Sequence, residues 1–523
     1  MGSNQADPSP SPATPAPTES EHIPPERNDE REAAPSPEGL PGSLRVSLSG
    51  GGIRATLFAF GAVLYLLDSG LNARVRAISS VSGGSIANAV LSVAGDISVS
   101  DDVDRHRHRI ARASWALAKH GVFFLGTVKG FFVTLFVAGL AFAAYIALLP
   151  TLLLSLSGTP SDIPHMYAAA GAEVFGLAAI TGVAFLLGVF FATWASRKLF
   201  QFQLYERALA YASTDDAKWL SRDHKREAKA VSEIRLSDLE GGAITHVFCA
   251  TDLVSGYPVF MTREAILNEV YGSGPASLPI GRAVYASAAF PAVFSPLRLP
   301  LTDWHGEGRE ADRPKRMYLS DGGVFNNLGT DWFAATEQAE QAASGGSEAT
   351  PSGVTASIVV NASKPPRVER RSAMLGMHVP ALLRAMTVVQ ENTVSPRLRL
   401  LTREPDTALV DIAQSPAALL AALKAHDSPD VRRRAADLES WFQLGKRADH
   451  WTSLAAKTSG ERTQLEAVGP ERARHLLRHG YMNAAVAAHC VFGSEFTPAR
   501  YDRDERWFAS LISSGERRTA PAR

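Results

Sequence analysis

The chain has 523 residues, and its 53 Lys plus Arg residues balance 53 Asp plus Glu residues, so the formal net charge is zero. This balance argues against a strongly basic nucleic-acid-binding protein, and no nucleic-acid partner is expected. Two cysteines, Cys249 and Cys490, are too few for a disulfide framework or a multi-cysteine zinc site. At about 100–200 residues per domain, the length allows two to four folded units.

The N-terminal segment differs in composition from the rest of the chain. Residues 1–43 hold ten of the 31 prolines and eight acidic residues against two basic ones. Such a segment buries too little apolar surface to offset its chain entropy, so we expect a disordered, Pro-rich acidic tail. It has no basic region followed by an apolar stretch and therefore does not resemble a secretory signal.

The folded part begins with a strand, a glycine loop and a helix. Apolar and polar residues alternate over 44–48, which predicts a strand, and apolar residues recur at helical spacing over 57–67. Between them lie Gly50, Gly51 and Gly52. Such a loop can gather several N–H groups at a helix N-terminus. It fits either a phosphate cradle or an oxyanion hole, and the spacing excludes a Walker loop.

A second turn follows in the same half of the chain. Residues 75–78 read as a buried strand, and 86–91 as a helix, with Ser80-Val81-Ser82-Gly83-Gly84 between them. A small-residue turn between a strand and a helix is typical of a nucleophile elbow, with Ser82 at its tip. A plain Ser/Gly-rich loop is the alternative interpretation.

The later half of the chain supplies a carboxylate. Apolar residues 317–319 lead into Asp321-Gly322-Gly323, which places an acid at the end of a predicted strand. The alternative is an ordinary turn. His246 lies in an apolar stretch, and we interpret it as a packed strand residue with no part in catalysis.

Two apolar runs separate the serine from the aspartate. Residues 130–149 and 174–196 are uncharged stretches of 20 and 23 residues. A helix needs about 20 residues to cross the hydrocarbon core, so we predict a transmembrane hairpin over 122–198. A pair of buried core helices is the alternative. Lys and Arg residues flank the hairpin, whereas its connector, 157–167, has none. The positive-inside rule then places the catalytic domain and both termini in the cytoplasm.

Taken together, these segments resemble the patatin-like phospholipase family. Residues 50–54 resemble its G-G-G-x-[RK]-G oxyanion motif, 80–84 its serine elbow and 321–323 its D-G-G/A motif. Residues 250–256 and 286–294 each resemble a recurrent family strand. The resemblance covers about 44–101 and 240–361, with a weaker continuation to about 492. This chain has Ala55 and Ser80 where the family usually has glycine.

The resemblance implies an α/β fold, a three-layer α/β/α domain interrupted by the hairpin. The first part of this domain would be 44–121 and the second part 199–500, followed by a C-terminal tail over 501–523. It also implies a Ser-Asp dyad of Ser82 and Asp321 that needs no cofactor or metal. The oxyanion hole would be built from Gly50, Gly51 and Gly52. The supporting residues would be Arg54, Ser80, Gly83, Gly84, Gly322 and Gly323. Arg54 would either bind anionic head groups or brace the loop.

The function expected from this resemblance is a membrane-anchored serine acyl hydrolase that cleaves phospholipids or lysophospholipids. A neutral-lipid lipase or a transacylase is the alternative enzyme, and a catalytically silent membrane scaffold or lipid-binding module is the alternative of another class. The expected partner is membrane lipid, and the expected location is the bacterial inner membrane. Protein partners are not predicted.

The C-terminal third predicts further regular elements. Residues 356–360 read as a strand, while 381–394, 417–424 and 472–489 read as helices. Pro396 is expected to end the first of these helices.

Overall fold

The computed structural model describes residues 41–99, 103–122, 230–239, 242–291, 294–306, 314–343, 355–364, 378–493 and 503–515. The predicted acidic tail up to residue 40 lies outside the described residues. So does the predicted transmembrane hairpin, apart from Val122.

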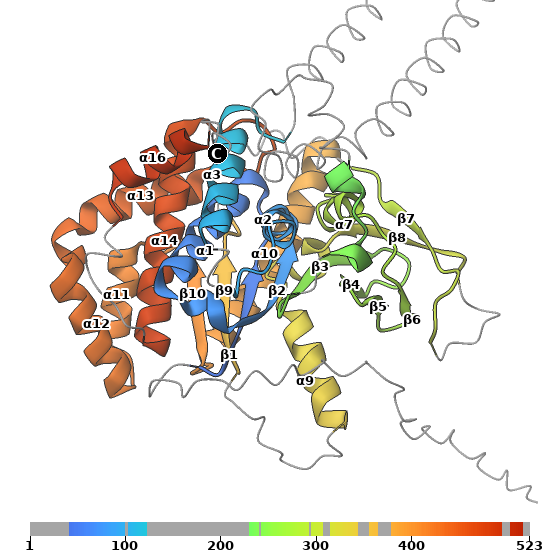
Figure 1. Ribbon diagram of the computed structural model, residues 1–523, viewed down its shortest axis with the longest axis horizontal. Helices are drawn as coiled ribbons and strands as arrows, with labels where there is room; N and C mark the ends of the chain where they lie inside the picture. The colour runs from blue at the N-terminus through green and yellow to red at the C-terminus, as the bar shows by residue number, and fades with distance from the viewer. Residues whose placement is uncertain are drawn as a thin grey trace, which may run out of the picture.

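A mixed ten-stranded sheet forms the centre of the protein (Figure 1). Its parallel part has the order β10-β9-β1-β2-β3. These strands are β1 (Ser43–Leu48), β2 (Val75–Val81), β3 (Thr245–Asp252), β9 (Thr355–Asn361) and β10 (Thr407–Asp411). The strands predicted near 44–48, 75–78 and 356–360 are thus present, whereas the segment predicted as a strand over 250–256 is strand only to Asp252 and continues as a turn.

Antiparallel strands extend the sheet beyond β3. They are β4 (Pro258–Met261), β5 (Ala265–Asn268), β6 (Gly272–Pro275), β7 (Leu297–Pro300) and β8 (Arg316–Asp321). β8 pairs with both β3 and β7, and its last residue, Asp321, lies opposite Ala250. Asp321 therefore lies at the C-terminal end of β3. The last residue of β2, Val81, pairs with the preceding β3 residue, Cys249, so β2 and β8 end close to each other.

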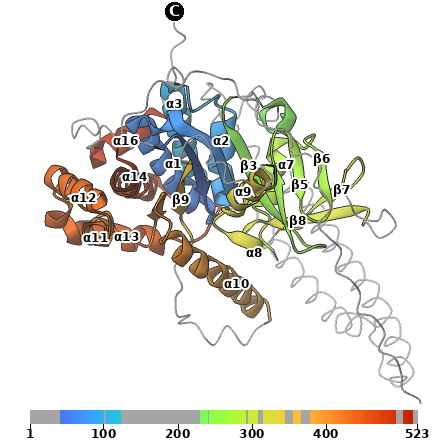
Figure 2. The same cartoon turned by 90° about the horizontal axis from the view of Figure 1, so that it is seen from below.

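Helices cover both faces of the parallel strands, which gives three layers (Figures 1 and 2). In β9, Ile358 and Val360 join the main core beneath α1 and α14, whereas Val359 packs with Val394 of α10 on the other face. This alternation is expected of a strand buried on both sides. The helices on the first face include α1 (Gly52–Ser69), α2 (Gly83–Ser92), α3 (Val103–Lys119) and α14 (Pro470–Phe492). The second face carries α9 (Asp331–Ala343) and α10 (His378–Leu401).

The remaining helices lie around this framework. They are α7 (Ile280–Ser287), α8 (Gly323–Asn326), α11 (Pro416–Lys424), α12 (Pro429–Phe442), α13 (Ala448–Gly460) and α16 (Glu505–Ser514). α16 falls within the predicted C-terminal tail. It buries Phe508 and Ile512 against the core, and this burial explains why a helix forms there.

Helix α1 lies in the middle of the core. Its packing against α14 is so close that a Cβ added at Gly61 would lie 2.1 Å from the Leu477 carbonyl oxygen. Among the described helices, α1 alone has the length and hydropathy of a membrane span, but 94% of that window is buried inside the protein. Its apolar character therefore reflects burial on all sides.

Two local predictions are wrong. Pro396 does not end its helix, because α10 continues through it to Leu401, and Leu398 and Leu401 pack beside Val394. This packing offsets the hydrogen bond that proline removes. The segment over 286–294 is not a strand either. Its described residues, 286–291 and 294, contain the end of α7 and an irregular turn, and the carbonyl oxygens of Ser287 and Ala289 accept from amides of the two loops of the site.

Candidate active site

Ser82 lies on a strained turn between β2 and α2. Its φ of 51° and ψ of −115° are unusual for a residue with a side chain, and its exposure is intermediate. The turn is tight because backbone lies directly against the two following residues. A Cβ on Gly83 would lie 2.2 Å from the Gly52 carbonyl oxygen, and one on Gly84 would lie 2.2 Å from that of Leu48. Only glycine fits these two places.

Asp321 meets Ser82 across this turn. The carboxyl group is 3% exposed and accepts a 2.7 Å hydrogen bond from the Gly323 amide. Burial raises the pKa of Asp321 to about 6, while the Gly323 amide and the nearby Ser82 side chain act in the opposite direction. The structure thus brings together the two residues that the sequence separates by the predicted hairpin.

The glycine loop lies against the same serine. A Cβ added to Gly50 would be 3.1 Å from the Ser82 Cβ. The Gly50 amide already donates to the Asn327 carbonyl oxygen at 3.0 Å. The amides of Gly51 and Gly52 have no acceptor among the described residues, and both lie at the N-terminal end of α1. These two amides are therefore the loop's available donors for an oxyanion beside Ser82.

Arg54 holds the loop from behind. The side chain is 1% exposed and donates to the carbonyl oxygens of Ala362 and Glu461, at 2.8 Å each. The Ile53 amide donates to the Gln464 carbonyl oxygen at 3.0 Å. The sequence left two roles open for Arg54, binding anionic head groups or supporting the loop. These contacts are those of a residue that supports the loop.

A family model described as patatin-like phospholipase matches residues 46–333, which is more than half of the chain. The chain belongs to the patatin-like phospholipase family. This match confirms the predicted family. No curated protein sequence matches the chain.

Two solved structures are similar to the chain at low identity. Human GIVD cytosolic phospholipase A2 is 12% identical, with 91% of this chain and 63% of that chain covered and a TM-score of 0.36. VipD from Legionella pneumophila is 11% identical, with 92% of each chain covered and a TM-score of 0.24. The patatin-like chain thus spans less than two thirds of the human phospholipase.

Ser80, which replaces a glycine of the family pattern, is accommodated beneath the elbow. Its hydroxyl donates to the Val247 carbonyl oxygen at 2.8 Å and accepts from Asn88 Nδ2 at 2.9 Å. Asn88 Oδ1 in turn lies 2.7 Å from His246 Nδ1. Burial lowers the pKa of His246 to about 4, and its ring bonds to Asn88 behind the elbow, as the interpretation of a packed histidine predicts.

The Asp-Gly-Gly motif of the patatin-like chain also depends on close approach. A Cβ on Gly322 would lie 2.4 Å from the Cys249 carbonyl oxygen, and the Gly323 amide bonds to Asp321 itself. Asn327 and Ser287 were not predicted as site residues, although both contact the elbow or its loop. The Ala286–Phe294 segment offered a signal for Ser287, but it was read as a strand.

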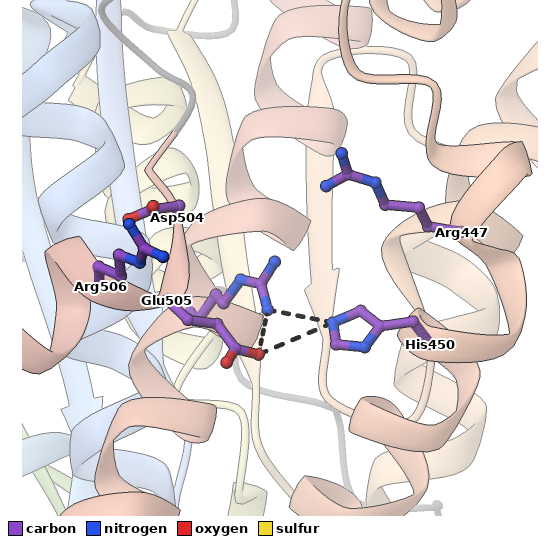
Figure 3. A pocket seen from close by; sticks show the side chains of 6 residues that line it. Arg447, His450, Asp504, Glu505 and Arg506 are labelled. Atoms are coloured by element: carbon purple, nitrogen blue, oxygen red, sulfur yellow. Dashed lines mark hydrogen bonds and ion pairs between the residues drawn. The ribbon is translucent and has the colours of Figure 1, made fainter.

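A charged hollow lies elsewhere, where α13, α14 and α16 meet (Figure 3). There, Arg478 donates to Glu505 at 2.7 Å and to His450 Nε2 at 3.1 Å. The six residues that line it are Arg447, His450, Arg478, Asp504, Glu505 and Arg506. No predicted site residue is among them, and the ion pair fastens α16 to α14.

Proposed function

We propose that this patatin-like protein is a membrane-anchored serine acyl hydrolase, which cleaves ester bonds of phospholipids or lysophospholipids with a Ser82–Asp321 dyad. The observation that carries the proposal is the placement of Ser82 beside the buried Asp321, because the amides of Ser82 and Gly322 donate to the same carbonyl oxygen, that of Ser287. Both groups lie beside the glycine loop, whose Gly51 and Gly52 amides are available donors.

The chemistry follows from these contacts. Ser82 Oγ attacks the ester carbonyl carbon while its proton passes to Asp321, and the Gly51 and Gly52 amides stabilise the oxyanion. The intermediate then expels the alcohol, which takes the proton from Asp321, and leaves an acyl group on Ser82. Water attacks this acyl group, again giving a proton to Asp321, and the fatty acid leaves as Ser82 regains its proton. The raised pKa of Asp321 makes it a stronger base than an ordinary carboxylate.

The membrane anchor rests on the two apolar runs of the sequence, 130–149 and 174–196. The contact between Ser82 and Asp321 supports a hairpin, because both flanks of the inserted segment must then lie on one side of the membrane. An even number of crossings satisfies this condition. With the positive-inside rule, that side is the cytoplasm, and the proposed location is the bacterial inner membrane.

The activity is tested on the purified full-length chain with defined phospholipids, lysophospholipids and triacylglycerol. We expect release of fatty acid and labelling by a fluorophosphonate, both lost in Ser82→Ala. The hydrolysis is also lost in Asp321→Asn. Ser92→Ala is the matched control, because it removes a buried hydroxyl that bonds only within α2, to the Ala89 carbonyl oxygen. Absence of labelling with every lipid would favour the scaffold, and transfer of acyl groups to an added alcohol would identify a transacylase.

The topology has its own test. In sealed inside-out and right-side-out vesicles, tags placed near residue 95 and near residue 303 should become accessible to protease from the same side. Exposure from opposite sides would contradict the hairpin and leave the activity measurement unaffected.

A further inference from the structure

Ser287, the last residue of α7, lies between the two loops that carry the dyad. Its carbonyl oxygen accepts hydrogen bonds from the Ser82 amide at 3.2 Å and from the Gly322 amide at 3.1 Å. Because Gly322 follows Asp321 directly, one carbonyl group joins the serine turn to the aspartate loop. Two residues on, the carbonyl oxygen of Ala289 accepts from the Asp321 amide at 3.0 Å.

The Ser287 hydroxyl adds a second set of contacts to the same place. It lies 2.6 Å from the Cys249 carbonyl oxygen, 2.7 Å from the Ser85 hydroxyl and 3.1 Å from the Ser82 amide nitrogen. A carbonyl oxygen can only accept, so the single hydroxyl proton of Ser287 points to Cys249. The oxygen therefore accepts from the Ser82 amide and faces the Ser85 hydroxyl, whose single proton is shared between Ser287 at 2.7 Å and Ser80 at 3.1 Å. Each contact of this fully buried side chain is with a polar group.

These contacts lie where the elbow needs support. Ser82 adopts a backbone conformation with positive φ, which persists only where the surrounding structure holds it in place. Its amide precedes the hydrogen-bonded ladder of α2, so its acceptor must come from outside that helix. Ser287 supplies this acceptor twice, through its carbonyl oxygen and through its hydroxyl oxygen.

We propose that Ser287 is a positioning residue for the reaction, whose hydroxyl fixes the Ser82 turn so that the Ser82 side chain meets Asp321. The inference rests on the proposed hydrolase activity. Loss of the Ser287 hydroxyl leaves the Ser82 amide with one acceptor and the Ser85 hydroxyl without its closer partner. The turn then loosens, and the Ser82 side chain is held less firmly beside Asp321.

The test compares Ser287→Ala with wild type on a water-soluble monomeric ester and on a fluorophosphonate. We expect kcat and the labelling rate to fall about tenfold, the factor that about 1.4 kcal/mol produces, with KM for the ester little changed. The second readout is the pH profile of kcat/KM. Since the nearby Ser82 side chain lowers the pKa of Asp321, its displacement should move the acid limb of the profile to higher pH.

Two further variants separate positioning from folding. Ser287→Cys keeps the volume of the side chain but replaces the hydroxyl with a weak hydrogen-bonding group, so its activity should stay low. Ser92→Ala loses a buried hydroxyl away from the elbow and should keep the wild-type pH profile. Full activity in Ser287→Cys, or an unshifted acid limb in Ser287→Ala, would overturn the proposal. If wild type itself shows no Ser82-dependent turnover, the hydrolase function has failed instead.

Discussion

Replacing Asp321 with Asn should abolish hydrolysis and at the same time stabilise the fold at neutral pH. Burial raises the pKa of this carboxyl from 3.8 to about 6, so the folded protein holds the proton more tightly than the unfolded chain. The stability that this group contributes is complete below about pH 4 and is lost as the pH rises to about 6. A shift of about 2 pKa units corresponds to about 3 kcal/mol. Asn cannot ionise and escapes this loss, and its amide oxygen can still accept from Gly323.

The measurement is the free energy of unfolding of the full-length chain in detergent micelles, from urea titrations at pH values between 3.5 and 8. We expect Asp321→Asn to exceed wild type by about 3 kcal/mol at pH 8. The difference should shrink between about pH 6 and pH 4 and vanish below that range. A variant less stable than wild type at pH 8, or a difference that does not change with pH, would refute the reasoning.

Three other predictions concern the same framework. The kcat/KM of wild type on a monomeric ester should rise with pH through about 6, because Asp321 must be ionised to accept the Ser82 proton. A pH profile whose rise is centred near pH 4 would contradict this. Gly83→Ala should lower turnover about 10²–10³-fold, since its Cβ, 2.2 Å from the Gly52 carbonyl oxygen, displaces an oxyanion donor. Normal steady-state rates in this folded variant would argue against Gly52. Gly61→Ala should lower the free energy of unfolding by about 1–3 kcal/mol, because the added Cβ forces α1 away from α14. Fluorophosphonate labelling should persist. An unchanged midpoint of urea unfolding would contradict this prediction.

The features that could be predicted from sequence are local ones. The alternation over 44–48, the glycine loop and the Ser80–Gly84 turn each lie within a few residues, so pattern and turn chemistry are sufficient to interpret them. The pairing of Ser82 with Asp321 required more, namely the order of several motifs along the chain. The structure explains how the two residues meet. The first part of β3 pairs with β2, and its last residues pair with β8 along the same edge, so the ends of β2 and β8 lie together.

The features that could not be predicted depend on contacts between distant segments. The acceptor for the Gly50 amide is Asn327, and no property of either residue alone indicates the other. Ser287 belongs to a segment predicted as a strand from its resemblance to the family, yet it is the last residue of α7, and its carbonyl oxygen accepts from the Ser82 and Gly322 amides. Pro396 shows tertiary packing prevailing over a local signal, because apolar neighbours on both sides of it are buried together.

The residues that support the glycine loop come late in the chain, and this order affects when the loop can take its final position. The acceptors of Arg54 and Ile53 are carbonyl groups of Ala362, Glu461 and Gln464, all of which follow the region that the family shares. A nascent polypeptide that already contains nucleophile and base still lacks these anchors. The loop is therefore fully braced only after the chain has been synthesised beyond Gln464. In a protein built in this way, the two reactive side chains are made long before the contacts that hold their glycine loop.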